Sequence, residues 1–346
     1  MKDLFATLKK TIRNCRFLFF LNFFSQFLMV LFSVATSYLS KVLVDALSGS
    51  LSEADPIEAF FVAALSFGKG AAYLKENISI LIGATVLFGV LSALSSVFRM
   101  LIRGYLREET RKILQLDLFD HLQKLPYPYF KSHKDGDLIQ TCTRDVDVVN
   151  RFFILDLSQA SYTLFVFALC FSVLMGASWK LTVVSLCLFP IMFVYSFFMI
   201  KKVRRSYAVT DESEARLTES ISENLDAVRI VKAFGQEEFE ISRFEMRLSD
   251  YKNRFLAWKK LSSFFYASSD IFIFASRALA LLYAIYLSVK SPAEISAGTV
   301  VLSYTFVNMM VWPMRGLAST LANLGQAIAS NDRIRLVMEE KEEDTE

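Results

Sequence analysis

Residues 157–200 read LSQASYTLFVFALCFSVLMGASWKLTVVSLCLFPIMFVYSFFMI, and Lys180 is the one charged residue in this stretch. A helix needs about 20 apolar residues to cross the hydrocarbon core of a bilayer. Because unpaired backbone groups are costly in lipid, an apolar run of this length favours an α-helix. The stretch therefore predicts two membrane-spanning helices, 157–179 and 181–200, joined by a short turn at Lys180.

The rest of the chain follows the same pattern. Its 346 residues are 54% hydrophobic and include 33 Phe, a composition typical of a membrane protein. A net charge of only +3 argues against a nucleic-acid partner. Four further runs have spanning length, namely 17–40, 77–98, 295–314 and 261–289, the last of which carries Asp270 and Arg277. We therefore predict an all-α membrane protein with six transmembrane helices, kinked where Pro190 and Pro313 lie inside spans.

The distribution of Lys and Arg predicts the orientation of these helices. Residues 1–16 carry five, 99–151 carry ten and 201–260 carry thirteen. The connections between them carry one or two each. Because basic residues accumulate in loops on the cytoplasmic side, we expect both termini in the cytoplasm. The compartment we expect is a plasma membrane, namely a bacterial inner membrane.

The two long basic connections are predicted to be helical rods rather than loops. Leu114, Leu118, Leu122 and Leu125 follow a helical spacing, so the helix that begins near residue 77 can continue to Pro126, which ends it. At 1.5 Å per residue that helix would be about 70 Å long, far more than a membrane requires. The connection 201–260 repeats the scheme. We therefore expect two helical hairpins that project from the membrane and carry exposed aromatic residues at their tips.

Three stretches carry a resemblance to a known family. They are LPYPYF at 125–130 followed by GDLIQTCTRDV at 136–146, ENLDAVRIVKAFGQE at 223–237, and VWPMRGL at 311–317 followed by ASNDRI at 329–334. In these stretches, and over nearly its whole length, the chain resembles the transmembrane domain of ABC exporters. It departs from the family at Thr141, where Arg is frequent, and at Ala227, where Gly is frequent.

The resemblance implies that the hairpin tips are coupling helices, near 126–132 and 228–237, which seat in grooves on nucleotide-binding domains. It implies a dimer of two such halves, as a homodimer or a heterodimer, in which the second tip reaches the motor of the partner half. The coupling residues implied are Pro126, Tyr127, Tyr129, Phe130, Arg229, Lys232, Phe234, Gly235 and Glu237.

The sequence contains no G-x-x-x-x-G-K-[ST] motif, which is the loop that cradles nucleotide phosphates. We therefore expect no catalytic site in this chain, and expect ATP and Mg²⁺ to be bound by a nucleotide-binding domain in the same or a separate polypeptide. The predicted organisation is an amphipathic interfacial helix at 1–16, the six-helix domain at 17–330 and an acidic linker at 331–346 toward that motor domain.

Three ionisable residues in or beside the spans, Asp270, Arg277 and Arg315, are candidates for a substrate cavity, because charges in lipid are costly. From helix depth, Asp270 and Arg315 are expected at a similar level and able to pair. They can equally form interhelical salt bridges or extend to the interface. No residues suited to metal binding share a ligand spacing, so we expect no metal site.

Three functions fit these observations to different degrees. The first is the translocation pathway of an ATP-driven exporter that works by alternating access. The second is a membrane scaffold or regulator that uses the same fold without a motor. An intramembrane enzyme is the third, and it lacks support because no Ser/His, paired-Asp or HExxH arrangement lies within the spans.

Overall fold

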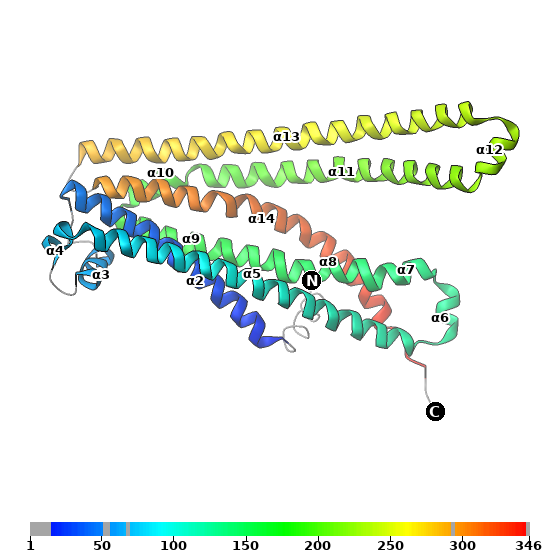
Figure 1. Ribbon diagram of the computed structural model, residues 1–346, viewed down its shortest axis with the longest axis horizontal. Helices are drawn as coiled ribbons and strands as arrows, with labels where there is room; N and C mark the ends of the chain where they lie inside the picture. Colours follow the sequence, from blue (N-terminus) through cyan, green and yellow to red (C-terminus); the bar gives the residue numbers. More distant parts are fainter. Residues whose placement is uncertain (1–14, 51–55, 67–69, 292–294, 344–346) are drawn as a thin grey trace. The chain divides into compact units, whose positions relative to one another are not determined.

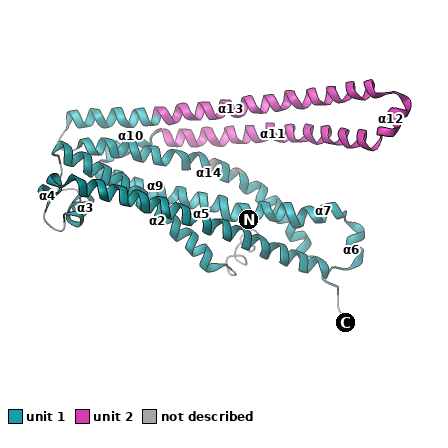
Figure 2. Ribbon diagram, viewed as in Figure 1, with its two compact units in different colours: residues 1–187, 276–346 teal, residues 188–275 magenta. Residues whose placement is uncertain are grey.

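The computed structural model describes residues 15–50, 56–66, 70–291 and 295–343. Almost every described residue belongs to a helix (Figure 1), as predicted. The predicted interfacial helix 1–16 lies outside the described residues except for its last two positions. The chain forms two compact units, residues 1–187 with 276–346, and residues 188–275 (Figure 2).

The helices of the first unit follow the order of the predicted spans. They are α2 (Arg16–Ser48), α3 (Pro56–Leu65), α4 (Ala71–Glu76), α5 (Ile78–Gln123), α6 (Tyr127–Ser132), α7 (Asp135–Gln140), α8 (Val146–Arg151), α9 (Leu157–Ala177), α10 (Trp179–Leu186), the end of α13 (Glu237–Lys290) and α14 (Ala297–Met338). Within this unit α2 packs along α5, α9 and α14.

Five helical stretches of the described chain are long and apolar enough to cross a membrane, and they contain five of the six predicted spans. They are Arg16–Ser48, Ile78–Gln123, Asp135–Ala177, Trp179–Asp226 and Glu237–Lys290. The sixth predicted span, 295–314, begins α14, which is 42 residues long but falls outside this apolar set. Leu302, Phe306 and Met310 of α14 are fully buried. Because neighbouring helices cover this face, α14 can carry more polar residues than a helix surrounded by lipid.

Polar side chains connect α2 to α9 within the apolar region. Asn22 Nδ2 donates to Ser158 Oγ at 3.1 Å, and one turn further along Gln26 Nε2 donates to Ser161 Oγ at 3.0 Å. Such interhelical hydrogen bonds are typical of helix packing in membranes. Lipid tails are as apolar as the side chains, so the hydrophobic effect does not drive helices together there. They set the register of α2 against α9.

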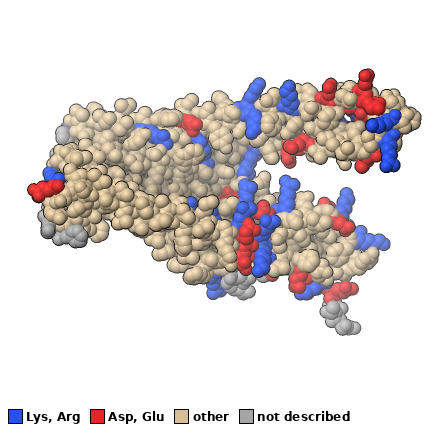
Figure 3. Space-filling model, viewed as in Figure 1, with Lys and Arg blue, Asp and Glu red and all other residues tan. Residues whose placement is uncertain are grey.

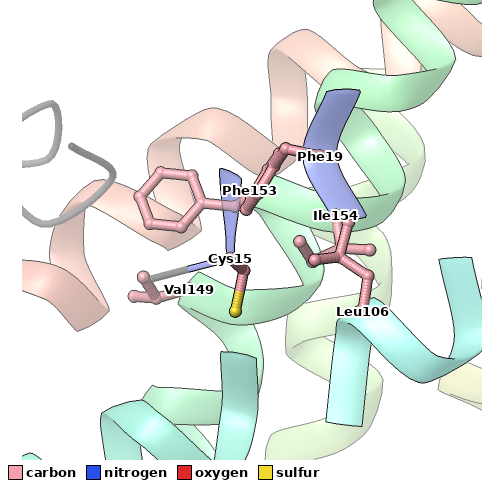
Figure 4. Close-up of a cluster of buried hydrophobic side chains, with 6 residues drawn as sticks. All are labelled: Cys15, Phe19, Leu106, Val149, Phe153 and Ile154. Carbon is pink, nitrogen blue, oxygen red and sulfur yellow. The ribbon is translucent and has the colours of Figure 1, made fainter. Parts of the chain in front are cut away.

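An apolar cluster joins the beginning of α2 to the long helices that leave the apolar region (Figure 4). Six buried side chains form it, namely Cys15, Phe19, Leu106, Val149, Phe153 and Ile154. Cys15 directly precedes α2, and the others come from α2, α5, α8 and the short π-helix η2 (Phe152–Asp156). The cluster therefore holds α5 and α8 together just where the polar hairpin begins.

The stretch Asp135–Ala177 is one long helical segment with two π-helical turns inside it. The first turn is η1 (Thr141–Asp145) and the second is η2. A π-turn inserts an extra residue into an α-helix and is common at functional sites. Nothing in the hydropathy pattern of the sequence predicted either turn.

The second unit is a hairpin of α11 (Leu188–Asp226), α12 (Val228–Phe234) and most of α13. Its two long helices are joined by the Tyr195–Ser268 hydroxyl contact and by the rings of Tyr207 and Trp258, whose centroids lie 5.0 Å apart. With α5 to α8 in the first unit, this hairpin confirms that both basic connections are helical rods with short turns.

The two prolines inside spans have different consequences. α10 ends at Leu186 and α11 begins at Leu188. Because Pro190 has no N–H to donate to the carbonyl four residues earlier, it interrupts the hydrogen-bond ladder there. α14 continues as one helix through Pro313.

Helix α14 extends to Met338. The beginning of the predicted acidic linker 331–346 is therefore helical. The residues after α14 then lie against the end of α5. His121 Nε2 lies 3.0 Å from the Val337 carbonyl and its Nδ1 lies 3.1 Å from Glu342 Oε1. The Glu343 N–H donates to the Lys124 carbonyl at 2.7 Å. The chain therefore leaves the six-helix domain beside the first hairpin tip.

Candidate functional site

The helix predicted at the first tip is present as α6, at the end of the hairpin formed by α5 and α7, and its coupling role stays a prediction. Pro126 precedes it in an extended conformation, which suits the residue before a helix. Tyr127 is 77% exposed at the tip. Tyr129 and Phe130, by contrast, are partly buried against a cluster that contains Leu122 and Val337.

This difference in exposure separates two roles of the aromatic residues that the sequence did not distinguish. Tyr129 also stacks on His133, with ring centroids 4.2 Å apart, and burial raises the pKa of its hydroxyl. We conclude that Tyr129 and Phe130 hold α6 on α5 and on the end of α14. Tyr127 alone of these three aromatic side chains is free to meet a partner.

The second predicted coupling helix is α12, and its surface is more exposed. None of its side chains is buried. Phe234 is 74% exposed and Ile230 is 61% exposed. Gly235 ends the helix with φ 61°, a left-handed conformation that glycine adopts without cost. Ala227, where the family often has Gly, has φ −91°, so the structure explains why a side chain is tolerated there.

Charges surround the apolar face of α12. Arg229, Lys232 and Glu237 are all exposed, and their contact with a motor domain stays a prediction. A short helix that exposes an aromatic anchor within a charged rim has the composition of a docking site.

Two aspartates tie α14 to the first hairpin, and the sequence analysis did not identify them. Asp145, the last residue of η1, accepts two hydrogen bonds from the Arg333 guanidinium, one of them at 2.7 Å. These bonds raise the pKa of Arg333. Asp156, the last residue of η2, accepts a hydrogen bond from Asn323 Nδ2 at 2.6 Å. Each π-turn therefore presents a carboxylate to α14.

The three candidate cavity residues occupy different surroundings. Asp270 is exposed on the part of α13 that belongs to the second unit, whereas Arg277 is half-buried on the part that belongs to the first. Arg315 is half-buried on α14, with its guanidinium carbon 5.2 Å from the ring centroid of Trp312. Because Asp270 and Arg315 lie in different units, their pairing stays a prediction.

A buried polar cluster joins α2, α3 and the beginning of α14, and the sequence analysis missed it too. Asp45 is fully buried and accepts hydrogen bonds from the Gly298 N–H at 2.8 Å and the Ser296 hydroxyl at 2.9 Å. A carboxylate in this position is favourable because a helix begins with unpaired N–H groups and a positive dipole end. Nearby, Lys41 Nζ lies 2.7 Å from Glu58 Oε2. The charges of Lys41 and Asp45, one helical turn apart directly after the run 17–40, were the available signal.

Gly298→Ala is expected to disrupt this cluster. A Cβ at Gly298 would lie 2.3 Å from the Lys41 carbonyl oxygen and 2.5 Å from Asp45 Oδ2, so the helices must separate and the Asp45 bonds must lengthen. We expect a loss of about 2 kcal/mol in unfolding free energy, the usual cost of unsatisfied buried polar groups.

The thermal unfolding midpoint in detergent measures this loss, and Gly316→Ala on the same helix is the matched control. A Cβ at Gly316 would approach only the flexible Gln159 side chain, at 3.1 Å. Equal midpoints for the two variants would contradict the proposed close packing at Gly298.

The fold and the tips together define a polytopic α-helical membrane protein with two long hairpins outside the apolar region. The sequence profile of the family described as ABC transporter transmembrane region matches residues 17–314. The chain belongs to this family, and the resemblance seen in its motifs is confirmed.

Individual relatives agree with the family assignment. The chain is 28% identical over 234 residues to the uncharacterized ABC transporter ATP-binding protein YknU of Bacillus subtilis, a match that covers 67% of this chain and 40% of the relative. It is 25% identical to the probable multidrug resistance ABC transporter ATP-binding/permease protein YheI of the same organism, with 64% of this chain and 38% of the relative covered. It is 28% identical to the ATP-dependent lipid A-core flippase of Hahella chejuensis, with coverage of 67% and 40%. The matches thus span about two fifths of the length of these relatives.

Proposed function

We propose that this chain forms the translocation pathway of an ATP-driven exporter, and that a nucleotide-binding domain docks on α6 and α12. The observation that carries the proposal is the exposed tip α12, on which Phe234 is 74% exposed at the end of a rigid hairpin. The exposure of an apolar aromatic side chain to water is unfavourable. Burial of this side chain against a partner would contribute about 2 kcal/mol to binding.

The proposed motor domain binds ATP and Mg²⁺, since this sequence lacks a phosphate-binding loop. The relatives support such a partner because their names include an ATP-binding part and the matched region covers only about two fifths of each. In this proposal both termini and both hairpin tips lie in the cytoplasm, and two halves assemble into one transporter.

Movement of the motor would reach the membrane by two routes. On the first hairpin, Tyr129 and Phe130 attach α6 to α5 and α14, and Asp145 attaches the hairpin to α14 again. On the second, α12 lies directly between the end of α11 and the beginning of α13. Because packed helices move as rigid bodies, displacement of a tip would reorient the spans. This is the basis of the proposed alternating access.

The substrate class we propose is amphipathic. Names of the relatives refer to multidrug resistance and to a lipid A-core flippase. Half-buried Arg277 and Arg315 would contact the polar or negatively charged part of such a molecule, while the apolar spans accommodate the rest.

The test is transport by the full-length protein that contains this chain, together with its nucleotide-binding domain, in inside-out vesicles. We expect fluorescent amphiphiles to accumulate in an ATP-dependent manner and to stimulate ATP hydrolysis. Vesicles that hold residues 1–346 alone should show neither activity. Absence of any ATPase that joins or co-purifies with the chain would contradict the exporter and support the motor-less scaffold.

A further inference from the structure

The second unit contains a basic groove between α11 and α13, close to where the apolar spans begin. It has a volume of about 350 Å³ and is lined by Lys202, Arg205 and Arg254 together with Val209, Ala257 and Leu261. All of these residues belong to residues 188–275 and therefore to one compact unit. The groove thus combines three cationic side chains with an apolar floor.

The position of the groove along its helices places it at the membrane surface. Lys202 is the second residue after the apolar run 181–200, and Leu261 is the first residue of the apolar run 261–289. From Lys202 to Val209 the helix advances about 10 Å, which is slightly more than the roughly 5–8 Å of the headgroup layer in one leaflet. Lys and Arg side chains gather along the α11–α13 hairpin beyond a mostly uncharged stretch of its surface (Figure 3).

Aromatic residues next to the groove mark the same level. Trp258 packs against Tyr207, and Lys259 Nζ lies 4.5 Å from the centroid of the Trp258 ring. Tyr and Trp concentrate at the boundary between hydrocarbon and headgroups because their rings are apolar and their N–H or O–H groups are polar.

Within the described residues, the protein balances only one of the three positive charges of the groove. Arg254 Nε donates to both carboxylate oxygens of Asp250, at 2.8 and 3.0 Å. Neither Lys202 nor Arg205 has an acidic partner within the described chain. A second groove further along the hairpin differs, because there Glu219 and Asp250 accompany Arg216 and Arg247. An anion is therefore favoured in the first groove and not in the second.

We propose that this groove binds the headgroup of an anionic phospholipid at the membrane surface. Lys202 and Arg205 would contact the phosphate oxygens, as cations bind phosphate by charge-assisted hydrogen bonds. The apolar floor at Val209, Ala257 and Leu261 would accommodate the glycerol and the beginning of the acyl chains. This inference requires membrane insertion but not ATP-driven transport, so the two proposals fail separately.

Quenching of Trp258 by brominated lipid tests the inference. The full chain carrying Trp179→Phe and Trp312→Phe retains Trp258 as its only tryptophan. It is reconstituted into phosphatidylcholine vesicles that contain brominated phosphatidylglycerol or, in parallel, brominated phosphatidylcholine. Each juxtamembrane cation contributes about fivefold in affinity for an anionic lipid, so we expect phosphatidylglycerol to be preferred by roughly 5-fold to 25-fold.

Two double variants separate a binding site from general charge attraction. Lys202→Gln with Arg205→Gln should abolish the preference. Lys252→Gln with Lys260→Gln removes the same charge from exposed positions on α13 that do not line the groove, and it should retain the preference. An equal loss in both double variants, or no preference in the parent chain, would overturn the proposal.

A further measurement distinguishes a lipid from a free anion as the ligand of the groove. Inorganic phosphate at millimolar concentration is added to the vesicles with phosphatidylglycerol. Unchanged quenching supports a lipid site, because the acyl chains anchor the headgroup. Complete loss of the preference would show that the groove takes soluble phosphate and would overturn the lipid assignment.

Discussion

Phe234→Ala in the full-length transporter is expected to reduce the amount of substrate moved per ATP hydrolysed by at least about tenfold. Phe234 is the one aromatic residue of α12 and is 74% exposed, and a central aromatic anchor contributes about 2 kcal/mol or more to an interface. Loss of that anchor leaves the motor able to bind and hydrolyse ATP but weakly connected to α11 and α13. Parallel measurements of transport and phosphate release in vesicles give this ratio.

Met246→Ala is the matched control for Phe234→Ala. Met246 is 69% exposed on α13, away from the tip, and its truncation should leave the ratio unchanged. Tyr127→Ala is expected to act as Phe234→Ala does, since Tyr127 is the exposed aromatic of α6. A normal ratio in both tip variants would remove the tips from the proposed coupling mechanism.

Arg333→Ala is expected to lower the unfolding free energy by about 2 kcal/mol, the usual cost when a buried acceptor loses its hydrogen-bond partner. The side chain of Asp145 is only 2% exposed, whereas that of Arg333 is 49% exposed. The variant therefore leaves a buried carboxylate without its cation. It also breaks a polar connection between α14 and the first hairpin, so transport should decrease as well.

The thermal unfolding midpoint in detergent measures the stability loss, and the double variant Asp145→Asn with Arg333→Met provides the control. Because an amide and an apolar chain replace both charges, the double variant should recover most of the stability lost in Arg333→Ala. Recovery of stability without recovery of transport would assign a mechanical role to the pair. If Arg333→Ala were as stable as the parent, the pair would contribute little.

The main features of the fold were predictable because each depends on residues close together in the sequence. The spans follow from uninterrupted apolar runs such as 157–200, and the hairpins follow from helical spacing in the basic connections. Pro126 predicted the end of α5, since proline cannot continue a helix there. The residues 329–334, the second part of the third stretch, were recognised as similar to the family. Their contact with η1 was not foreseen.

The candidate site was predictable only in part. The tips were located correctly as α6 and α12, but three aromatic residues of the first tip were treated alike. Their roles differ because Tyr129 and Phe130 pack on Leu122 and Val337, and Val337 lies more than 200 residues further along the chain. Whether an aromatic side chain points to a partner or to its own core depends on that packing.

The sequence by itself determined that this protein is a membrane-embedded helical domain with two projecting rods, because hydropathy and helical periodicity are local properties of the chain. Only the tertiary structure decided which polar residues meet: Asp145 with Arg333, Asp45 with Gly298, and Lys202 with Arg254 across one groove. The physical reason is that the energy of a buried charge depends on the group opposite to it. Residues far apart in the sequence become neighbours only after the helices have packed.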